Sequence, residues 1–263
     1  MKTYVFTGAS SGIGAATKRI VEEQGIQVIN IDLRNCDIVA DLSSDAGRQA
    51  AIDAVIERCP DGIDGLVCFA GVSGDCGKPA LMASLNYYGA VAIAEGLFES
   101  LQKKNGSCVL LASDSIAEGY AIQKFVQLML TPGSEPKLLG ALGGMDGETV
   151  LRMGNAMYIT SKYAIALWVR RHAAMWGARG VHLNCVAPGT VNTPMVSNMS
   201  ERAMWALNSL QVPVKYGKFL MLEPEEVANV IAFLLSPLAS GIHGTTLFID
   251  GGTEAAINTE HVY

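Results

Sequence analysis

Apolar and polar positions along this chain alternate in blocks of strand length and of helix length. Short apolar runs such as Val67-Cys-Phe-Ala70 and Val109-Leu-Leu-Ala112 are typical of strands that are buried on both faces of a parallel sheet. The expected strands are Lys2–Thr7, Gln27–Leu33, Gly65–Phe69, Cys108–Ala112, Val181–Val186 and Thr245–Ile249. The expected helices are Ile13–Gln24, Asp45–Arg58, Leu85–Leu101, Ile122–Leu130, Tyr158–Trp176 and Pro224–Leu235. This alternation predicts an α/β fold with a doubly wound parallel sheet and helices on both faces.

Residues 114–157 interrupt this regular order. They contain one helical piece, a breaker cluster Thr131-Pro-Gly-Ser-Glu-Pro136 and a glycine-rich stretch Gly140–Gly147. An excursion of this length between a strand and the next long helix is usually functional or a surface insertion. Since no repeat or linker divides the chain, we expect a single domain over residues 1–263.

Composition narrows the class of protein. The chain has 263 residues, half of them hydrophobic, and a net charge of −6, which argues against a nucleic-acid-binding surface. No apolar run approaches the roughly 20 residues that span a membrane, and the glycine loop begins before a signal-peptide core could form. The six cysteines show no CxxC pair, as expected for reduced packing residues of a cytoplasmic protein. The histidines have no partner at metal-ligand spacing, so no metal site is expected; they are His172, His182, His243 and His261.

A glycine-rich segment, Thr7-Gly-Ala-Ser-Ser-Gly-Ile-Gly14, joins the first strand to the first helix. Glycines there permit a tight turn and let the backbone approach a pyrophosphate, which a helix N-terminus favours electrostatically. An ordinary glycine-rich turn is the alternative, but the position at the first strand–helix junction favours a dinucleotide site.

Asp32 ends the second strand, where a carboxylate can accept both ribose hydroxyls. It would repel a 2′-phosphate, which favours NAD over NADP, although Arg34 nearby could accommodate that phosphate. A solvated aspartate at the end of a strand is the alternative. Asp41 and Leu42 could cover the adenine, and Asp41 could equally cap the helix that follows.

Tyr158-Ile-Thr-Ser-Lys162 can supply acid–base chemistry. On a helix, residues four apart share one face, so the ammonium would lie beside the phenol. A neighbouring cation is expected to lower the phenol pKa from about 10 towards the range of general acid–base catalysis. The spacing is common on helices, so its meaning depends on the other motifs.

Taken in order, these motifs resemble those of the short-chain dehydrogenase/reductase family. The matching set is Thr7–Gly14, Ala70-Gly71, Asn86, Ser113, Tyr158-x-x-x-Lys162, Pro188-Gly189 and Ile249-Asp-Gly-Gly252, and it covers nearly the whole chain. The resemblance implies a Rossmann fold and hydride transfer between NAD and an alcohol or ketone. The chain departs from the family in having Cys68-Phe69 where members usually have two asparagines, and in the long interval between Ser113 and Tyr158.

The resemblance also implies roles for individual residues. Tyr158 would be the general acid–base, and Lys162 would lower its pKa and bind the nicotinamide ribose. Asn86 would support a water-mediated proton relay to Lys162; a buried amide that satisfies helix backbone is the alternative. Ser113 would orient the substrate oxygen, with Ser115 as the alternative. The implied cofactor contacts are Gly8, Ser11, Gly12, Ile13, Gly14, Asp32, Asp41, Leu42, Ala70, Gly71, Tyr158, Lys162, Val191 and Thr193.

Within the family, the long insertion and several short sequence segments resemble the bacterial 3α-hydroxysteroid dehydrogenase/carbonyl reductase type. The similar segments include Gly154-Asn-Ala-Met-Tyr158 and Val230-Ile-Ala-Phe-Leu-Leu-Ser-Pro237. This likeness implies a steroid or bile acid substrate, and a homodimer because the insertion covers the helix face on which ordinary members form tetramers.

A segment at about 190–220 could form a movable apolar lid over such a substrate, although an ordinary amphipathic core helix fits the same pattern. Its apolar residues are Met195, Val196, Met199, Met204, Trp205 and Leu207. Two other functions stay open: a dehydrogenase for another bulky alcohol or ketone, and a dinucleotide sensor without chemistry, which the intact serine, tyrosine and lysine disfavour. The tail Asn258–Tyr263 is expected to be an interface or disordered.

Overall fold

The structure, a computed structural model, describes residues 1–144, 147–201, 204, 212–215 and 221–261. Within these residues, seven parallel strands form one sheet in the order β3-β2-β1-β4-β5-β6-β7. The strands are β1 (Thr3–Thr7), β2 (Gln27–Asp32), β3 (Ile38–Val39), β4 (Gly65–Cys68), β5 (Ser107–Leu111), β6 (His182–Pro188) and β7 (Thr246–Ile249). The strand order reverses between β1 and β4. The carboxyl ends of these strands therefore form the crevice in which open α/β sheets bind ligands.

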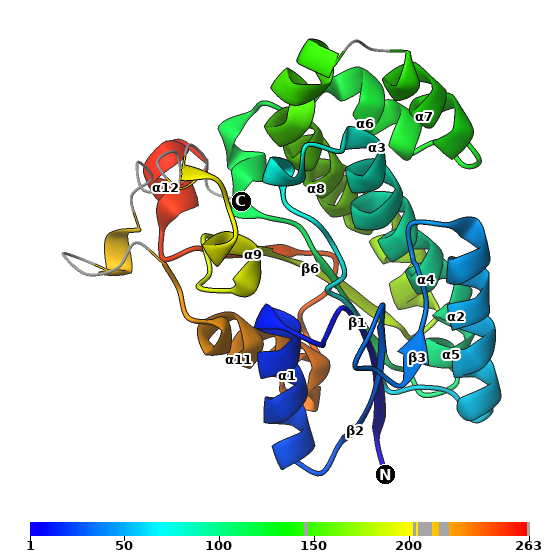
Figure 1. Cartoon of the computed structure of the whole chain (residues 1–263). Helices are drawn as coiled ribbons and strands as arrows, with labels where there is room; N and C mark the ends of the chain where they lie inside the picture. The colour runs from blue at the N-terminus through cyan, green and yellow to red at the C-terminus, as the bar shows by residue number, and fades with distance from the viewer. Residues whose placement is uncertain (145–146, 202–203, 205–211, 216–220, 262–263) are drawn as a thin grey trace.

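Helices cover both faces of the sheet (Figure 1). One face carries α1 (Gly12–Glu23) and α11 (Pro224–Leu235); the other carries α2 (Asp45–Arg58), α4 (Ala90–Gly96), α5 (Phe98–Gln102) and α8 (Gly147–Ala178). Successive strand residues point to opposite faces, so Tyr4 and Phe6 enter the core with α1 and α11, whereas Val5 enters the core on the other face. The predicted doubly wound parallel sheet with a Rossmann arrangement is confirmed.

The region expected to be irregular between residues 131 and 147 contains a helix, so that prediction was wrong. After α6 (Gln123–Met129), helix α7 runs over Glu135–Gly143. Pro136 lies in its first turn, where a missing N–H removes no helical hydrogen bond. Helix α8 begins at Gly147 instead of Tyr158 and is 32 residues long. The breaker residues thus begin helices here instead of preventing them.

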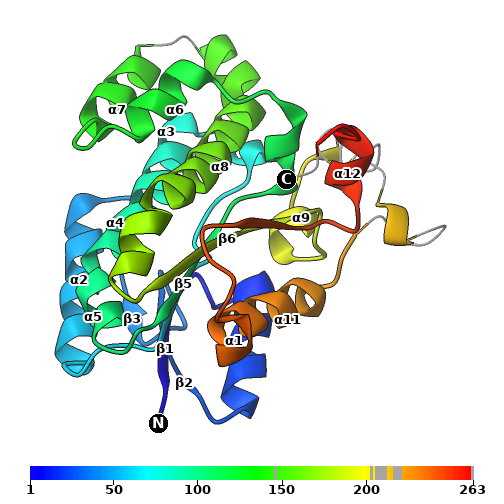
Figure 2. The same ribbon diagram turned by 180° about the vertical axis from the view of Figure 1, so that it is seen from behind.

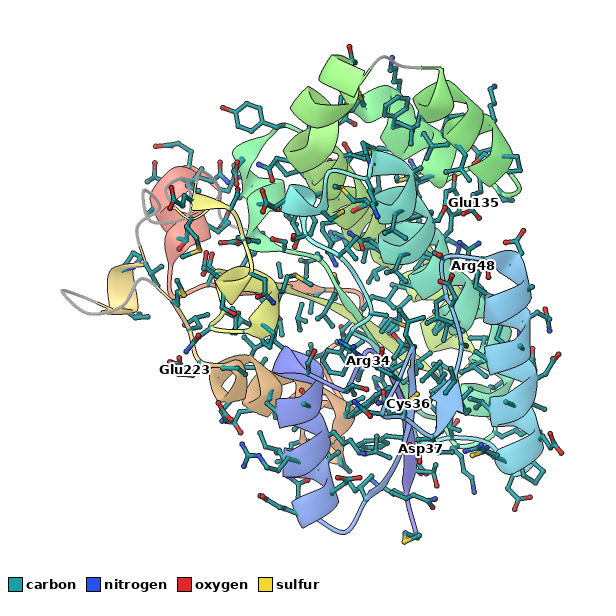
Figure 3. The ribbon with its side chains drawn as sticks, in the orientation of Figure 1. Arg34, Cys36, Asp37, Arg48, Glu135 and Glu223 are labelled. Atoms are coloured by element: carbon teal, nitrogen blue, oxygen red, sulfur yellow. The ribbon has the colours of Figure 1, made fainter. Side chains whose placement is uncertain are left out.

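At the end of the molecule away from the N-terminus, α6 lies against α8, and α7 packs on α6, α3 (Pro79–Leu81) and η2 (Met82–Gly89) (Figure 2). Their buried side chains join the same apolar core as α8; they are Phe125, Val126, Met129, Leu138 and Leu142. At the start of α7, Glu135 meets Arg48 of α2 in an ion pair with N–O distances of 2.5 and 2.9 Å (Figure 3). The insertion is therefore attached to the sheet domain through both an apolar core and a charged contact.

The helix expected at Leu85–Leu101 is divided in the structure. After α3 (Pro79–Leu81), residues Met82–Gly89 form a π-helical turn, η2, which then leads into α4 and α5. Such wide turns are rare and have no simple sequence pattern. The sequence also did not predict several short elements: η1 (Gly74–Cys76), η3 (Asp114–Glu118), α9 (Pro194–Ser197), η4 (Pro213–Lys215), η5 (Pro237–Ala239) and α12 (Thr253–Ile257).

All six cysteines are free thiols. Cys59, Cys68, Cys108 and Cys185 are buried, whereas Cys36 and Cys76 are partly exposed. Burial raises the pKa of Cys68 and of Cys185 to about 12. Across the residues that the structure describes, no three metal-ligating side chains gather into a cluster, and no helix there is both long and apolar enough to cross a membrane.

Candidate active site

The glycine turn after β1 is held against two other segments. Gly8 has φ +73°, and a Cβ atom there would lie 2.7 Å from the backbone of Ala70, so only glycine fits. A Cβ atom at Gly12, where φ is +56°, would lie 3.3 Å from the methyl group of Thr193. Because the first N–H groups of a helix have no intrahelical partner, the start of α1 offers donors beside these segments. Three predicted cofactor segments thus meet at this turn.

Asp32 lies beside the glycine turn, as the sequence predicts. Its Oδ2 accepts the N–H of Ser10 at 3.2 Å, and its Oδ1 accepts the N–H of Leu33 at 2.7 Å. The hydroxyl of Ser10 donates to the carbonyl of Arg34 at 3.0 Å, and the Arg34 side chain is exposed (Figure 3). The carboxylate and the arginine therefore lie on the same short turn after β2.

Asn30 also shapes the glycine turn, and the sequence analysis missed it. This residue of β2 is 1% exposed. Its Oδ1 accepts the N–H of Ala9 and its Nδ2 donates to Ser10 Oγ, both at 3.0 Å. A polar residue within the apolar strand Val28-Ile-Asn-Ile31 is the signal that could have revealed it, since a buried amide needs partners.

Asp41 and Leu42 have local roles before α2. Asp41 is exposed, and hydrogen bonds from the Ser43 hydroxyl and N–H lower the pKa of its carboxyl group. The N-cap of α2 is Ser44, whose Oγ accepts the N–H of Gly47 at 3.1 Å. Asp41 is thus not the cap. Leu42 is 4% exposed and packs in the core, so little of its side chain is available to a ligand.

Tyr158, Ser113 and Lys162 come together at the carboxyl end of β5. The Ser113 side chain lies close enough to Tyr158 to lower the pKa of its phenol. Lys162 is buried and donates from Nζ to the carbonyl of Leu111 at 2.9 Å, while the same Nζ lies 5.8 Å from the centre of the Tyr158 ring. The helical spacing therefore places phenol and ammonium on one face, beside the predicted serine.

The expected effect of Lys162 on the phenol is absent, and that expectation was wrong. Burial raises the pKa of Tyr158 to about 12; the side chain of Ser113 lowers it in part, and the charge of Asp114 raises it again. The ammonium is directed to the Leu111 carbonyl, and burial lowers the pKa of Lys162 to about 8. Desolvation of the phenol outweighs the neighbouring cation at this geometry.

Asn86 lies in the π-helical turn and joins it to the loop after β4. Its Oδ1 accepts the N–H of Val72 at 2.8 Å, and its Nδ2 donates to the Val72 carbonyl at 3.0 Å. A Cβ atom at Gly71 would lie 3.0 Å from Asn86 Oδ1 and 3.8 Å from Lys162 Nζ, so Gly71 lets these side chains approach the loop. The amide pairs with the backbone of this neighbouring loop instead of that of its own helix.

The predicted serine is embedded in a polar cluster at the start of η3. Ser113 Oγ accepts the N–H and the hydroxyl of Ser115 at 3.3 and 3.1 Å and donates to Asp114 Oδ1 at 3.2 Å. Ser113, not Ser115, is the serine that lowers the pKa of the Tyr158 phenol. Asp114 is the polar residue of this cluster that the sequence analysis did not select.

The segment after β6 approaches the catalytic helix through η1. Val191 is buried and pairs with Leu222 in a short parallel bridge. Further along, Ser200 donates its N–H and its hydroxyl to the carboxylate of Asp75 at 2.7 and 2.8 Å. The neighbour of that aspartate in η1, Gly74, packs on Tyr158, since a Cβ atom there would lie 3.3 Å from the tyrosine Cβ.

The expected lid is described in part. Val196 is buried, Met195 is 42% exposed, and Met199 and Met204 are partly exposed. Trp205 and Leu207 lie outside the described residues.

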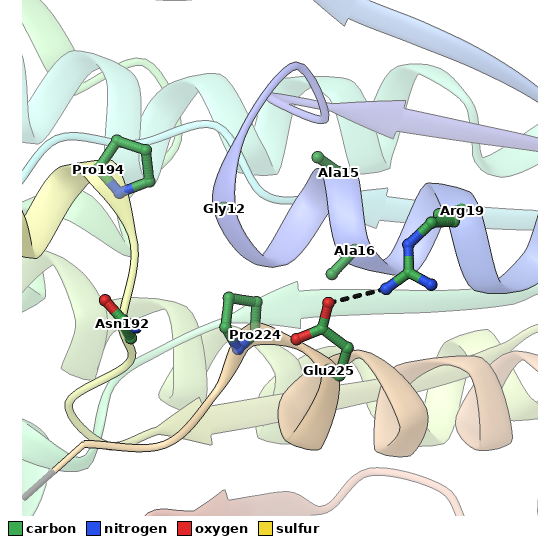
Figure 4. Close-up of a pocket in the computed structure, with 8 residues that line it drawn as sticks. All are labelled: Gly12, Ala15, Ala16, Arg19, Asn192, Pro194, Pro224 and Glu225. Atoms are coloured by element: carbon green, nitrogen blue, oxygen red, sulfur yellow. Dashed lines mark hydrogen bonds and ion pairs between the residues drawn. The ribbon is translucent and has the colours of Figure 1, made fainter. Parts of the chain in front are cut away.

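A cavity of about 400 Å³ opens between α1 and α11 (Figure 4). Arg19 and Glu225 form an ion pair of 2.7 Å at one side, and Gly12 lies at another. The cavity therefore adjoins the glycine turn, and its lining contains neither Tyr158 nor Lys162.

Two characterised enzymes resemble the chain over nearly their whole lengths. The chain is 36% identical to the 3-alpha-hydroxysteroid dehydrogenase/carbonyl reductase of Comamonas testosteroni, over 98% of each protein. It is 32% identical to the coniferyl-alcohol dehydrogenase of Pseudomonas sp. (strain HR199 / DSM 7063), over 95% of this chain and 96% of that protein. A family described as enoyl-(acyl carrier protein) reductase matches residues 140–254.

A solved structure also resembles the chain over nearly its whole length. The 3-alpha-hydroxysteroid dehydrogenase from Pseudomonas sp. B-0831, complexed with NADH, superposes with a TM-score of 0.88 at 37% identity. The match covers 99% of this chain and 100% of that chain. The likeness therefore includes the insertion as well as the sheet.

Proposed function

Because the chain belongs to the short-chain dehydrogenase/reductase family, we propose that it is an NAD-dependent dehydrogenase of hydroxysteroids or bile acids. Family membership makes it an oxidoreductase that acts on alcohols or ketones. The observation that carries the proposal is the grouping of Ser113, Tyr158 and Lys162 at the carboxyl edge of the sheet.

A nicotinamide dinucleotide fits the residues around the glycine turn. Gly8 and Gly12 leave no side chain in the turn, and the start of α1 offers N–H donors to a pyrophosphate. Asp32 keeps lone pairs beyond those used by its two N–H partners and can accept ribose hydroxyls. The other proposed cofactor contacts remain those of the sequence analysis, from Ser11, Ile13, Gly14, Asp41, Leu42, Ala70, Gly71, Val191 and Thr193.

When bound, the nicotinamide supplies the acceptor or donor of the hydride. Tyr158 takes the proton of the alcohol during oxidation and returns one to the carbonyl oxygen during reduction. Ser113 donates a hydrogen bond to the same substrate oxygen, where negative charge develops. Lys162 has a pKa of about 8 and is therefore mostly charged at pH 7, so it can bind the ribose. Asn86 fixes the loop beside Lys162 through Val72.

The preference for NAD follows from the charge of Asp32. A carboxylate beside the ribose repels a 2′-phosphate, whereas it can accept the two hydroxyls of NAD. Arg34 is exposed and its backbone, not its guanidinium, is held by Ser10. The NADH complex of the similar dehydrogenase supports the same cofactor for this chain.

The steroid substrate is supported by the two 3-alpha-hydroxysteroid dehydrogenases that the chain resembles. Apolar residues of the segment after β6 could cover such a body as a lid within about 190–220, with Met195 partly exposed for contact. The second candidate is a dehydrogenase of other bulky alcohols, because the chain is also 32% identical to an enzyme for coniferyl alcohol.

Oxidation assays with NAD test this function. NADH formation is measured with hydroxysteroids that differ in the position and configuration of the hydroxyl, and with coniferyl alcohol. Tyr158→Phe is the matched control, because it removes one oxygen from the same ring. The proposal is supported if the parent protein oxidises a hydroxysteroid and Tyr158→Phe does not. Turnover with coniferyl alcohol alone selects the second candidate, and NAD binding without any turnover would indicate a sensor.

We further propose that the protein is a cytoplasmic homodimer with one domain over residues 1–263. The six free thiols suit a reducing compartment. β7 is an edge strand among the described residues, and its Phe248 is 37% exposed; Phe233 and Leu238, on the segment before it, are 39% and 82% exposed. Uncovered sheet edges and clustered apolar groups favour association with a second copy.

A further inference from the structure

A buried carboxyl group adjoins the Ser113 hydroxyl and has no part in the roles proposed above. Asp114 begins the turn η3 and is 9% exposed. Its Oδ1 accepts the hydrogen bond from Ser113 at 3.2 Å. Its Oδ2 faces the end of β6, where a Cβ atom at Gly189 would lie 3.3 Å away. The carboxyl group therefore extends from the proposed catalytic serine towards the next strand.

A second buried carboxyl group lies on the other side of Gly189. A Cβ atom at that glycine would lie 3.0 Å from the Cβ of Asp250, which is 5% exposed. The oxygens of Asp250 accept the N–H groups of Gly252 at 2.9 Å and Glu254 at 2.6 Å, at the start of α12. The charge of Asp250 thus lies across Gly189 from Asp114, and a neighbouring carboxylate disfavours the ionised form of the Asp114 carboxyl group.

Most of the influences on Asp114 act in the same direction. Burial, then the charge of Asp250, raise the pKa of Asp114 to about 7; the hydrogen bond from Ser113 opposes this, and Glu118 on the same turn adds to it. On α8, Tyr158 faces Asp114, and the ammonium of Lys162 is directed to a carbonyl of β5. A change in the charge of Asp114 at physiological pH would therefore be felt by both reacting hydroxyls.

We propose that Asp114 is a positioning residue that controls the Ser113 hydroxyl and the Tyr158 phenol through its own charge. When Asp114 is ionised, its carboxylate holds the O–H of Ser113 and disfavours the phenolate of Tyr158. When Asp114 is protonated, that O–H can turn to the substrate oxygen, and the phenolate forms at a lower pH. Asp114 touches neither substrate nor cofactor in this role, which presupposes the dehydrogenase activity proposed above.

The pH profile of alcohol oxidation tests this role in the variant Asp114→Asn. Asparagine has nearly the same size and carries no charge at any pH. At a separation of about 6 Å and an effective dielectric constant of about 20 to 40, removal of one negative charge lowers the pKa of a phenol by about one to two units. The rising limb of log(kcat/KM) should therefore shift by about one to two units towards lower pH. The Kd for NADH, measured by fluorescence titration, should stay unchanged.

Glu118→Gln is the matched control, because it removes a carboxylate of the same turn that makes no hydrogen bond with Ser113 in the part of the chain that the structure describes. In Glu118→Gln, the rising limb of log(kcat/KM) should lie at the same pH as in the parent protein. If Asp114→Asn keeps the limb of the parent, Asp114 has a structural role only and the proposal fails. Asp114→Ser, which is small and neutral, gives the same test if the asparagine variant does not fold. A parent protein that oxidises no alcohol with NAD would instead refute the proposed function, before any variant is compared.

Discussion

Replacing Arg48 by alanine should lower the melting temperature markedly. Arg48 is 4% exposed and donates to both carboxylate oxygens of Glu135, at 2.5 and 2.9 Å. The same guanidinium donates to the carbonyls of Leu42 at 2.9 Å and Ser84 at 2.7 Å. Alanine would leave one largely buried carboxylate and two carbonyls without their partner. The insertion and the π-helical turn would both lose a contact to α2.

The magnitude follows from the burial of this pair. Removing one partner of a buried ion pair costs about 3 to 5 kcal/mol, because the remaining charge is left uncompensated. In a domain of this size each kcal/mol lowers the melting temperature by about 2 to 4 °C. Arg48→Ala should therefore melt about 6 to 20 °C below the parent protein.

Thermal unfolding followed by circular dichroism measures the effect, and the chain offers a matched control. Asp45 also contacts Arg48, at 2.8 Å, but its side chain is 93% exposed. Asp45→Asn should therefore change the melting temperature by about 2 °C or less, as expected for an exposed pair within a helix. If Arg48→Ala and Asp45→Asn melt at the same temperature, burial of the Glu135 pair does not stabilise the fold, and the reasoning is refuted.

Four further outcomes are expected. Tyr158→Phe should keep the Kd for NADH, measured by calorimetry, and lose about 10² to 10⁴ in kcat, because its proton donor is gone; residual kcat above a tenth of the parent value would contradict the role. Asp32→Ala should lower the ratio of kcat/KM for NAD to that for NADP by at least about tenfold, because repulsion of the phosphate is lost. An unchanged ratio would show that the carboxylate does not set the preference. At pH 8, the free energy of unfolding measured with urea should be higher for Asp114→Asn than for the parent protein, by on the order of 3 kcal/mol. Because the pKa of Asp114 is raised to about 7 in the folded protein, the carboxyl stabilises the fold at low pH and loses this effect as pH rises through 7. The difference in the free energy of unfolding between variant and parent should therefore vanish near pH 4. An equal difference at pH 4 and pH 8 would contradict the raised pKa of Asp114. Leu238→Glu should convert a dimer to a monomer in light scattering, and an unchanged mass would exclude this face.

The sheet could be predicted because its strands are buried on both faces. Each is a short apolar run such as Val67–Phe69, and such runs differ clearly from the helices between them. The π-helical turn and α7 could not be predicted in the same way. The π-helical turn depends on tertiary packing against α8, and α7 depends on packing against α6 and on the ion pair with Arg48, which local preference does not record.

At the site, backbone positions were easier to predict than side-chain states. Gly8 and Tyr158 lie where the motifs place them, because turn geometry and helical spacing determine these positions. The direction of the Lys162 ammonium and the burial of Asp114 were not predictable. The direction of the ammonium depends on the carbonyl of Leu111 at the end of β5. The burial of Asp114 depends on the segment of Asp250, which is distant in sequence.

The uneven exposure of the thiols makes this protein suited to site-selective labelling without mutation. Cys36 Sγ donates to the carbonyl of Asp32 at 3.3 Å, and Cys76 lies in η1, which packs on the catalytic helix. These are the two partly exposed thiols among all six cysteines. A maleimide dye on Cys36 would report on the turn after β2, and one on Cys76 on η1 beside α8. The distance between the two labels could then be followed by energy transfer while ligands bind.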